Sequence, residues 1–183
     1  MAFEIEVKAH VPDPYSAQTA IEALEGISAS FPIDKDDWYF SAQGEPVLFR
    51  LRREAGRVLF TRKRKRMDGD IETNEEFEFE TDGNQFDGAV AFVASLGYEV
   101  VAKKTKRGLA YSLAWGEGLG DLTIELCEVS SLGWFIELEF VLEERTLVED
   151  AKRALVKALA LLEIENSQLE GKPYLLLLSQ ITG

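Results

Sequence analysis

Near its start the chain reads Phe3-Glu4-Ile5-Glu6-Val7-Lys8, a stretch in which apolar and charged residues alternate strictly. Successive side chains of a β-strand point to opposite faces, so Glu4, Glu6 and Lys8 share one face of the predicted strand. Two carboxylates beside an ammonium group offer ligands for a divalent cation and for an anion. Periodicity alone also fits a strand whose charged face lies in water, so the other strands have to decide between the two.

The same separation of charged and apolar faces recurs along the chain. The pairs that place two charged residues on one face are Arg50 and Arg52, Glu76 and Glu78, Lys104 and Lys106, and Glu137 and Glu139. In a β-sandwich such faces lie outside, in water. In a barrel whose apolar faces are covered by helices, they line the interior, where like charges repel unless both signs and bound ligands are present. The residues by themselves leave both arrangements open.

The charged faces together carry ligands for metal ions and for phosphate. Carboxylates suited to hard cations such as Mg²⁺ or Mn²⁺ are Glu4, Glu6, Glu76, Glu78, Glu137 and Glu139. Cations suited to phosphate oxygens are Lys8, Arg50, Arg52, Lys63, Lys104 and Lys106. This combination is typical of a site for a polyphosphate with bound metal ions.

Strand-like segments dominate, and they predict an α+β domain built on a meandering antiparallel sheet or a closed barrel. The expected strands are residues 4–10, 38–41, 47–53, 57–66, 75–81, 98–106, 109–115, 121–129 and 134–142. The expected helices are residues 13–24, 86–96, 146–162 and 173–180. A capping box that begins at Thr146 opens the third helix, and Gly97 ends the second. Residues 1–183 are expected to form a single domain.

Composition narrows the class of protein. A formal net charge of −13 argues against a nucleic-acid partner. The chain has no run of 18 apolar residues and no apolar signal core at its start, so we expect neither a membrane partner nor secretion. The single cysteine, Cys127, excludes an intramolecular disulfide and fits a reducing compartment. A cytoplasmic location is therefore expected.

The order of these segments resembles the CYTH domains, or triphosphate tunnel metalloenzymes, which include class IV adenylyl cyclases, thiamine triphosphatases and inorganic tripolyphosphatases. Their N-terminal signature is Glu-x-Glu-x-Lys, and residues 4–8 match it fully. Later segments that resemble family motifs are Asp37-Trp38-Tyr39-Phe40, Phe49-Arg50-Leu51-Arg52, Thr61-Arg62-Lys63, Glu76-Phe77-Glu78, Leu96-Gly97-Tyr98 with Lys104-Thr105-Lys106, residues 132–139 and Pro173-Tyr174-Leu175.

The resemblance implies an eight-stranded antiparallel closed β-barrel with flanking helices, whose hydrophilic tunnel binds a triphosphate with one or two Mg²⁺ or Mn²⁺ ions. The six glutamates named above are the implied metal ligands, and the six cations are the implied phosphate ligands. The implied catalytic residues are Glu4, Glu6, Lys8, Arg50 and Arg52. A homodimer is compatible with the resemblance.

The motifs look most like those of the class IV adenylyl cyclases, which predicts a metal-dependent enzyme that converts ATP to cyclic AMP and pyrophosphate. An inorganic tripolyphosphatase or a thiamine triphosphatase is the first alternative, because the charged residues do not distinguish the nucleophile. A noncatalytic module that binds polyphosphate or nucleotides is the second.

Three positions depart from the family pattern. Cys127 stands where family members usually carry an aspartate, and we expect it on the wall of the tunnel, as a structural thiol. Ser41 replaces an aspartate that often follows Tyr-Phe. Lys106, or Arg107 if the position is displaced, stands where an arginine is usual, and lysine lacks the bidentate fork of arginine.

Overall fold

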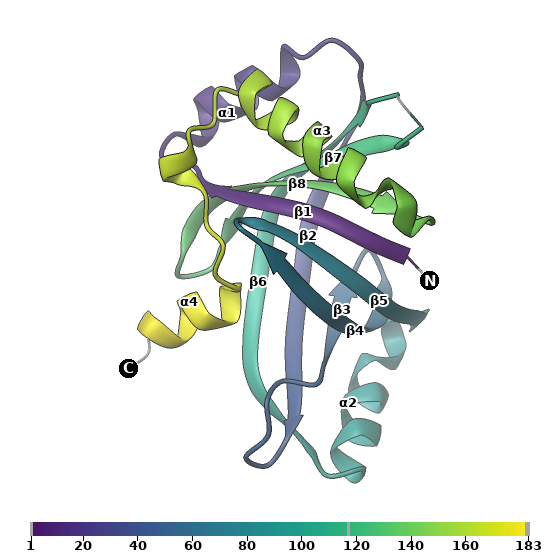
Figure 1. Cartoon of the computed structure of the whole chain (residues 1–183). Helices are drawn as coiled ribbons and strands as arrows, with labels where there is room; N and C mark the ends of the chain where they lie inside the picture. The colour runs from purple at the N-terminus through teal and green to yellow at the C-terminus, as the bar shows by residue number, and fades with distance from the viewer. Residues whose placement is uncertain (1, 117, 182–183) are drawn as a thin grey trace.

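The computed structural model describes residues 2–116 and 118–181, and within them eight antiparallel strands close into a barrel (Figure 1). The strands are β1 (Ala2–His10), β2 (Ile27–Ala42), β3 (Phe49–Glu54), β4 (Arg57–Asp68), β5 (Ile71–Asp82), β6 (Tyr98–Ala114), β7 (Asp121–Val129) and β8 (Gly133–Leu142). Their order around the barrel is β1-β5-β4-β3-β2-β6-β7-β8, and β8 pairs with β1 to close it. The predicted fold class is therefore confirmed.

Four α-helices flank the barrel in the described part of the chain: α1 (Pro14–Glu22), α2 (Phe86–Ser95), α3 (Val148–Leu161) and α4 (Tyr174–Ile181). In Figure 1, α1 and α3 lie together across the side formed by β1, β7 and β8, and α2 lies at the far end of β6. The C-terminal helix α4 stands apart from the others, beside β6. Among these helices, none has the length and apolar run that a bilayer crossing needs.

The helices bury the apolar faces of the strands on the outside of the barrel. Ile5 of β1 and Leu138 and Phe140 of β8 are fully buried, and they belong to one apolar cluster with Ala151 and Leu155 of α3. A second cluster forms where α2 packs on β2, β3 and β4. Because the pleat sends alternate side chains to opposite faces, the charged residues must face the interior. The alternative of charged faces in open water is thus wrong.

The strand β2 is much longer than the predicted residues 38–41. It runs from Ile27 to Ala42 and pairs with β6 along nearly all of this length. Pro32 and the charged residues 34–37 interrupt the alternation of apolar and polar residues by which a strand is recognised in a sequence. Proline is tolerated because β3 pairs only with residues 36–40, so the first half of β2 has one neighbour.

The predicted strands 98–106 and 109–115 form one continuous strand, β6. Gly108 lies between the two predicted segments. A Cβ atom at this position would come within 2.1 Å of the backbone oxygen of Leu126 and 2.7 Å of the Cα atom of Cys127. The glycine therefore allows β6 and β7 to approach each other closely, and it does not interrupt the strand.

The helix ends follow the predicted signals except at Thr146. Asp13 accepts hydrogen bonds from the backbone N–H groups of Tyr15 and Ser16 and so caps α1. Gly97 follows α2 with a φ of 87°, which suits a glycine past a helix end. The prediction of a capping box at Thr146 is wrong, because residues 145–147 form a 3₁₀ turn and α3 begins at Val148 without a side-chain cap.

Replacing Leu138 with alanine should lower the free energy of unfolding by about 2–5 kcal/mol, because the change removes buried methyl groups beneath α3 and leaves a cavity. Val141→Ala, at a half-exposed position of the same strand, is the matched control and should change it by less than about 0.5 kcal/mol. Urea denaturation followed by circular dichroism measures both. Equal losses in the two variants would contradict the burial of the outer face.

Candidate functional site

The barrel encloses a cavity of about 400 Å³, and side chains from all eight strands meet in it. Every residue that the sequence predicted for the site lines this cavity. They are Glu4, Glu6, Lys8, Arg50, Arg52, Lys63, Glu76, Glu78, Lys104, Lys106, Glu137 and Glu139. The strict alternation along each strand explains the convergence, since every second residue of a closed barrel points inward.

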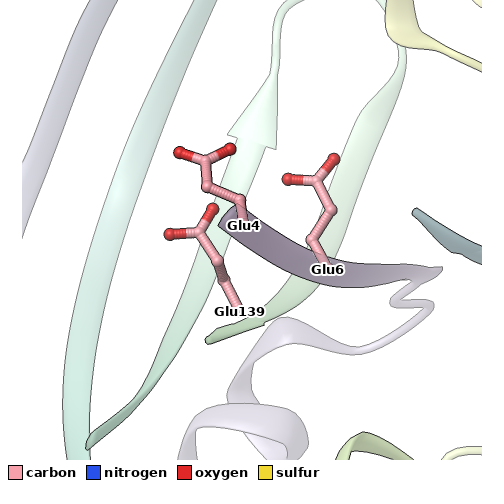
Figure 2. Close-up of side chains that lie close together, drawn as sticks. All are labelled: Glu4, Glu6 and Glu139. Carbon is pink, nitrogen blue, oxygen red and sulfur yellow. The ribbon is translucent and has the colours of Figure 1, made fainter. Parts of the chain in front are cut away.

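Three of the glutamates gather into one acidic cluster, formed by Glu4 and Glu6 of β1 and Glu139 of β8. One carboxylate oxygen from each lies within 4.8 Å of the other two. Figure 2 shows the three side chains rising from two neighbouring strands with their carboxylates on the same side. Glu6 and Glu139 are direct partners across the β1–β8 ladder, which fixes their spacing.

Burial makes this acidic cluster costly in the absence of a cation. It raises the pKa of Glu4 to about 7 against the attraction of Lys63, and the pKa of Glu6 to about 6. It also raises the pKa of Glu139 well above its usual range, and the charges of Glu4 and Glu6 add to the effect. Oxygen ligands with too little positive charge nearby are what Mg²⁺ and Mn²⁺ prefer. The cluster therefore fits such an ion.

Glu137, two residues before Glu139, belongs instead to the basic side of the cavity. It accepts hydrogen bonds from Lys106 Nζ on one oxygen and from the hydroxyl of Tyr174 on the other. Burial opposes its ionisation, but Lys106 and Lys104 outweigh burial and hold the pKa of Glu137 below its usual value. The sequence grouped Glu137 with the metal ligands, whereas the structure surrounds it with cations.

Glu76 and Glu78 on β5 also lie outside the acidic cluster. Lys63 Nζ is 2.7 Å from Glu76 Oε1 and also contacts Glu4, so it bridges β5 and β1. Glu78 accepts a hydrogen bond from Thr61 Oγ1 at 2.6 Å and is exposed to solvent. Both carboxylates line the cavity, but each has a partner of its own.

The basic wall is organised around Asp37, a fully buried carboxylate on β2. Arg52 donates to both of its oxygens, from Nε at 2.6 Å and from Nη2 at 3.0 Å. Lys104 Nζ lies 3.0 Å and Arg50 Nη1 3.8 Å from Asp37 Oδ2. Burial opposes ionisation, but Lys104, Arg52 and Arg50 hold the pKa of Asp37 well below its usual range. One anion thus orients three cations.

Glu125 on β7 pairs with two further cations. Lys106 Nζ lies 3.0 Å from Glu125 Oε2, and Lys35 donates to Oε1. Burial would raise the pKa of Glu125, but Lys106 and Lys35 hold it far below its usual value. Arg107 lies outside the cavity, exposed, and pairs with Asp34 at 3.1 Å. Of these two residues, Lys106 is therefore the one that lines the cavity.

Two cations on the wall have donors that none of the described residues accepts. The Nε atom of Arg50 is buried and has no hydrogen-bond partner in the part of the chain that the structure describes. Lys8 is 8% exposed, and its ammonium group makes no ion pair within the described residues. Burial lowers the pKa of Lys8. Buried donors of this kind are rarely left unsatisfied, and phosphate oxygens are acceptors of the right charge.

Cys127 is not among the residues that line the cavity, although alternation places it on the same face of β7 as Glu125. It packs in an apolar cluster with Ile33, Val129 and Phe135, and the cavity residue Tyr174 packs against this cluster. Burial raises the pKa of its thiol to about 12, and nearby carboxylates add to the shift, so the thiol is neutral. The expected structural role is therefore right. Ser41, the second departure, is also buried and donates its hydroxyl to the next backbone carbonyl at 2.8 Å.

Sequence reasoning missed several members of the site. They are Lys35, Asp37, Tyr39, Thr61, Lys65, Glu72, Glu125 and Tyr174. Lys35 was lost because its half of β2 was not recognised as a strand. Lys65 and Glu72 form an ion pair and continue the alternation of β4 and β5. Lys65 lies one step beyond Lys63, and Glu72 lies two steps before Glu76, so a longer period on each strand would have found them. Tyr174 comes from the C-terminal segment, where no local pattern places it.

Solved structures of similar proteins have the same fold. The PH1819 protein of Pyrococcus horikoshii OT3 is 27% identical, with a TM-score of 0.75 over 97% of this chain and 99% of that one. An adenylate cyclase candidate from Vibrio parahaemolyticus is 19% identical, with a TM-score of 0.75 over 97% and 98%. The Hippeastrum protein HpAC1, an adenylyl cyclase candidate with a dominant triphosphatase activity, is 17% identical, with a TM-score of 0.62 over 94% and 91%.

No curated protein matches the chain. A family model gives the decisive match, because it aligns with residues 2–174 and so spans the barrel, its cavity and the start of α4. The description of that model is the CYTH domain. A match over nearly the whole chain, together with the closed barrel, means that this protein belongs to the CYTH domain family.

Proposed function

We propose that this chain is a metal-dependent enzyme that binds a triphosphate in the barrel cavity, and that it converts ATP to cyclic AMP and pyrophosphate. CYTH domain proteins are typically enzymes that process triphosphates. The observation that carries the proposal is the division of the cavity. One side holds carboxylates with too little compensating charge, and the other holds cations with donors left over.

The acidic cluster would hold the metal ion, through Glu4, Glu6 and Glu139. When bound, the ion neutralises charge on the phosphates and acidifies a coordinated hydroxyl group or water. Glu76 and Glu78 lie near enough to the cavity to be ligands of a second ion. Glu137 has a different role in this proposal, because its hydrogen bonds orient Lys106 toward the cavity.

The cations on the basic wall would bind the phosphate oxygens. Lys8 and the Nε atom of Arg50 offer donors that no described residue accepts. Arg52 and Lys104 are held in position by Asp37, so little side-chain entropy is lost when the anion arrives. Lys63 on β4 and Lys106 on β6 complete the set. Fixed cations of this kind stabilise the charge that develops on phosphate oxygens during cleavage.

An apolar portion of the lining favours an organic triphosphate over an inorganic one. Val47, Leu48, Phe49 and Leu59 line the cavity together with Arg50. Apolar side chains next to a charged wall suit a substrate with a polar end and a flat organic end, such as a nucleotide. A purely inorganic tripolyphosphate would make no use of them.

The second candidate is a metal-dependent triphosphatase that acts on tripolyphosphate or a related compound. The acidic cluster would orient a water molecule as readily as a ribose hydroxyl, since both nucleophiles need the same cation. HpAC1 of Hippeastrum, whose dominant activity is that of a triphosphatase, has this fold. The two reactions differ in which phosphorus atom faces the nucleophile.

Product analysis distinguishes the candidates. The purified protein is incubated with Mg²⁺ or Mn²⁺ and either ATP or tripolyphosphate, and cyclic AMP, pyrophosphate and orthophosphate are measured. Cyclic AMP with equimolar pyrophosphate is the expected result. Orthophosphate without cyclic AMP would replace the cyclase by the triphosphatase. No turnover, with thermal stabilisation by triphosphates, would point to a noncatalytic binding module instead.

Glu6→Gln and Glu139→Gln should each lower metal-dependent turnover by about 100-fold or more, because each removes a charged ligand of the cation. Both substitutions keep the size of the side chain, so the melting temperature should not fall. Glu99→Gln, an exposed change on β6, is the matched control and should leave turnover unaltered. Full activity in the Glu6 and Glu139 variants would contradict the proposed metal site.

Magnesium binding should weaken as the pH falls through the range in which Glu4 and Glu6 take up protons. With a pKa of about 7 for Glu4 and about 6 for Glu6, protons compete with the cation in acid. Between about pH 8 and pH 5.5 the Kd for Mg²⁺ should therefore rise roughly tenfold or more. Isothermal titration calorimetry measures it, and Glu4→Gln should flatten the dependence. A Kd that does not change with pH would refute the assignment.

The same shifts fix the sign of the stability change without metal. A carboxyl group whose pKa is raised above its ordinary value of 4.5 binds more protons in the folded state than in the unfolded state. The metal-free protein should therefore lose stability as the pH rises from about 4.5 to 7, and Mg²⁺ should restore it above that range. Thermal denaturation with and without Mg²⁺ tests the sign.

A further inference from the structure

The segment before α4 is attached to the end of β1 and brings Tyr174 to the cavity. Leu169 forms an isolated antiparallel bridge with Ala9, and the backbone N–H of Glu170 donates to the carbonyl of Lys8 at 2.9 Å. The chain then turns into α4, which begins at Tyr174. Tyr174 lines the cavity although it lies outside the barrel strands.

The hydroxyl group of Tyr174 fixes one carboxylate of the cavity. It donates to Oε1 of Glu137, while Lys106 donates to Oε2 of the same group. Both oxygens of Glu137 are thus engaged on the basic side. This geometry keeps Glu137 apart from the acidic cluster, although Glu139 in that cluster is only two residues away.

The aromatic ring of Tyr174 lies among three ammonium groups. The Nζ atoms of Lys104, Lys8 and Lys106 are 4.8, 5.3 and 5.6 Å from the ring centroid. These distances are within the range of cation–π attraction. Phe135 packs edge-on against the ring at 5.0 Å and holds its orientation. One side chain therefore contacts three of the proposed phosphate ligands at once.

We propose that Tyr174 is a positioning residue of the phosphate site, whose hydroxyl keeps Glu137 beside Lys106 and whose ring holds the three lysines toward a common anion. The inference rests on the proposed function. Without the hydroxyl, the charge of Glu137 is less satisfied and competes more strongly with the anion for the lysines. Without the ring, the ammonium groups lose the negative face that offsets their mutual repulsion.

The competing explanation is that Tyr174 only helps α4 to pack against the barrel. Leu177 on the same helix packs against the apolar cluster of Ile33, Cys127, Val129 and Phe135 and does not line the cavity. Leu177→Ala therefore loosens the helix without removing a group from the phosphate site. It is the matched control for the loss of packing.

The test is the affinity of the whole chain for tripolyphosphate without divalent metal, measured by isothermal titration calorimetry in the presence of EDTA. Tyr174→Phe removes only the hydroxyl and should weaken binding about fivefold, as expected for one lost hydrogen bond. Tyr174→Leu removes the ring as well and should weaken it about 30-fold or more. Leu177→Ala should lower the melting temperature and keep the affinity within about twofold of wild type.

Two results would overturn the role of Tyr174. One is an affinity of Tyr174→Leu within about twofold of wild type. The other is a loss in Leu177→Ala as large as that in Tyr174→Leu, with Tyr174→Phe unchanged, because packing alone would then explain the effect. The failure of the proposed function gives a different result: the wild-type protein then binds neither tripolyphosphate nor ATP, even with Mg²⁺. Wild-type binding with unchanged affinity in Tyr174→Leu overturns only the role of Tyr174.

Discussion

Charge inside a protein has to be compensated at short range, and this constraint governs the whole barrel. Asp37 has no contact with solvent, and three cations surround it. Glu125 has Lys35 and Lys106. Compensation is incomplete at the acidic cluster, where three carboxylates share the nearby charge of one lysine. The candidate site thus lies where charged side chains inside the barrel are only partly compensated by other protein groups.

The charge of the cavity differs from that of the whole molecule. Eight acidic and eight basic residues line it among those that the structure describes, so the wall is close to neutral. The formal net charge of −13 must then come from the exterior. The net charge of the whole chain therefore says nothing about anions inside the barrel, because a closed wall separates the two environments.

The alternation of the strands predicted which residues share a face, and it named twelve residues that meet in one cavity. It did not predict which face points inward, because a period of two is the same for a sandwich and a barrel. The resemblance to a known family favoured the barrel, and the burial of Ile5 and Leu138 under α3 established it. Asp37 and Lys35 were missed for a physical reason. Their roles depend on residues of opposite charge from other strands, and one sequence segment does not show its neighbours.

The placement of Glu137 shows the same limit at the level of single side chains. The spacing of Glu137 and Glu139 puts both on one face of β8, and the sequence treated them alike. Tyr174 and Lys106 donate hydrogen bonds to Glu137 and hold it on the basic side of the cavity, and both donors are distant from Glu137 in the sequence. The departures at Cys127 and Ser41, in contrast, lie outside the cavity and leave its charged lining intact.

The order of the strands has a consequence for synthesis of the protein. β1 is synthesised before the other strands, but it pairs with β5 and β8. The backbone groups at its two edges therefore have no strand to pair with until these later strands have been translated. Contacts of such long sequence separation slow folding and leave the apolar side of Ile5 and Val7 uncovered meanwhile. Tyr174 comes later still. The nascent chain thus has every charged strand of its barrel before the tyrosine that contacts its lysines has been made.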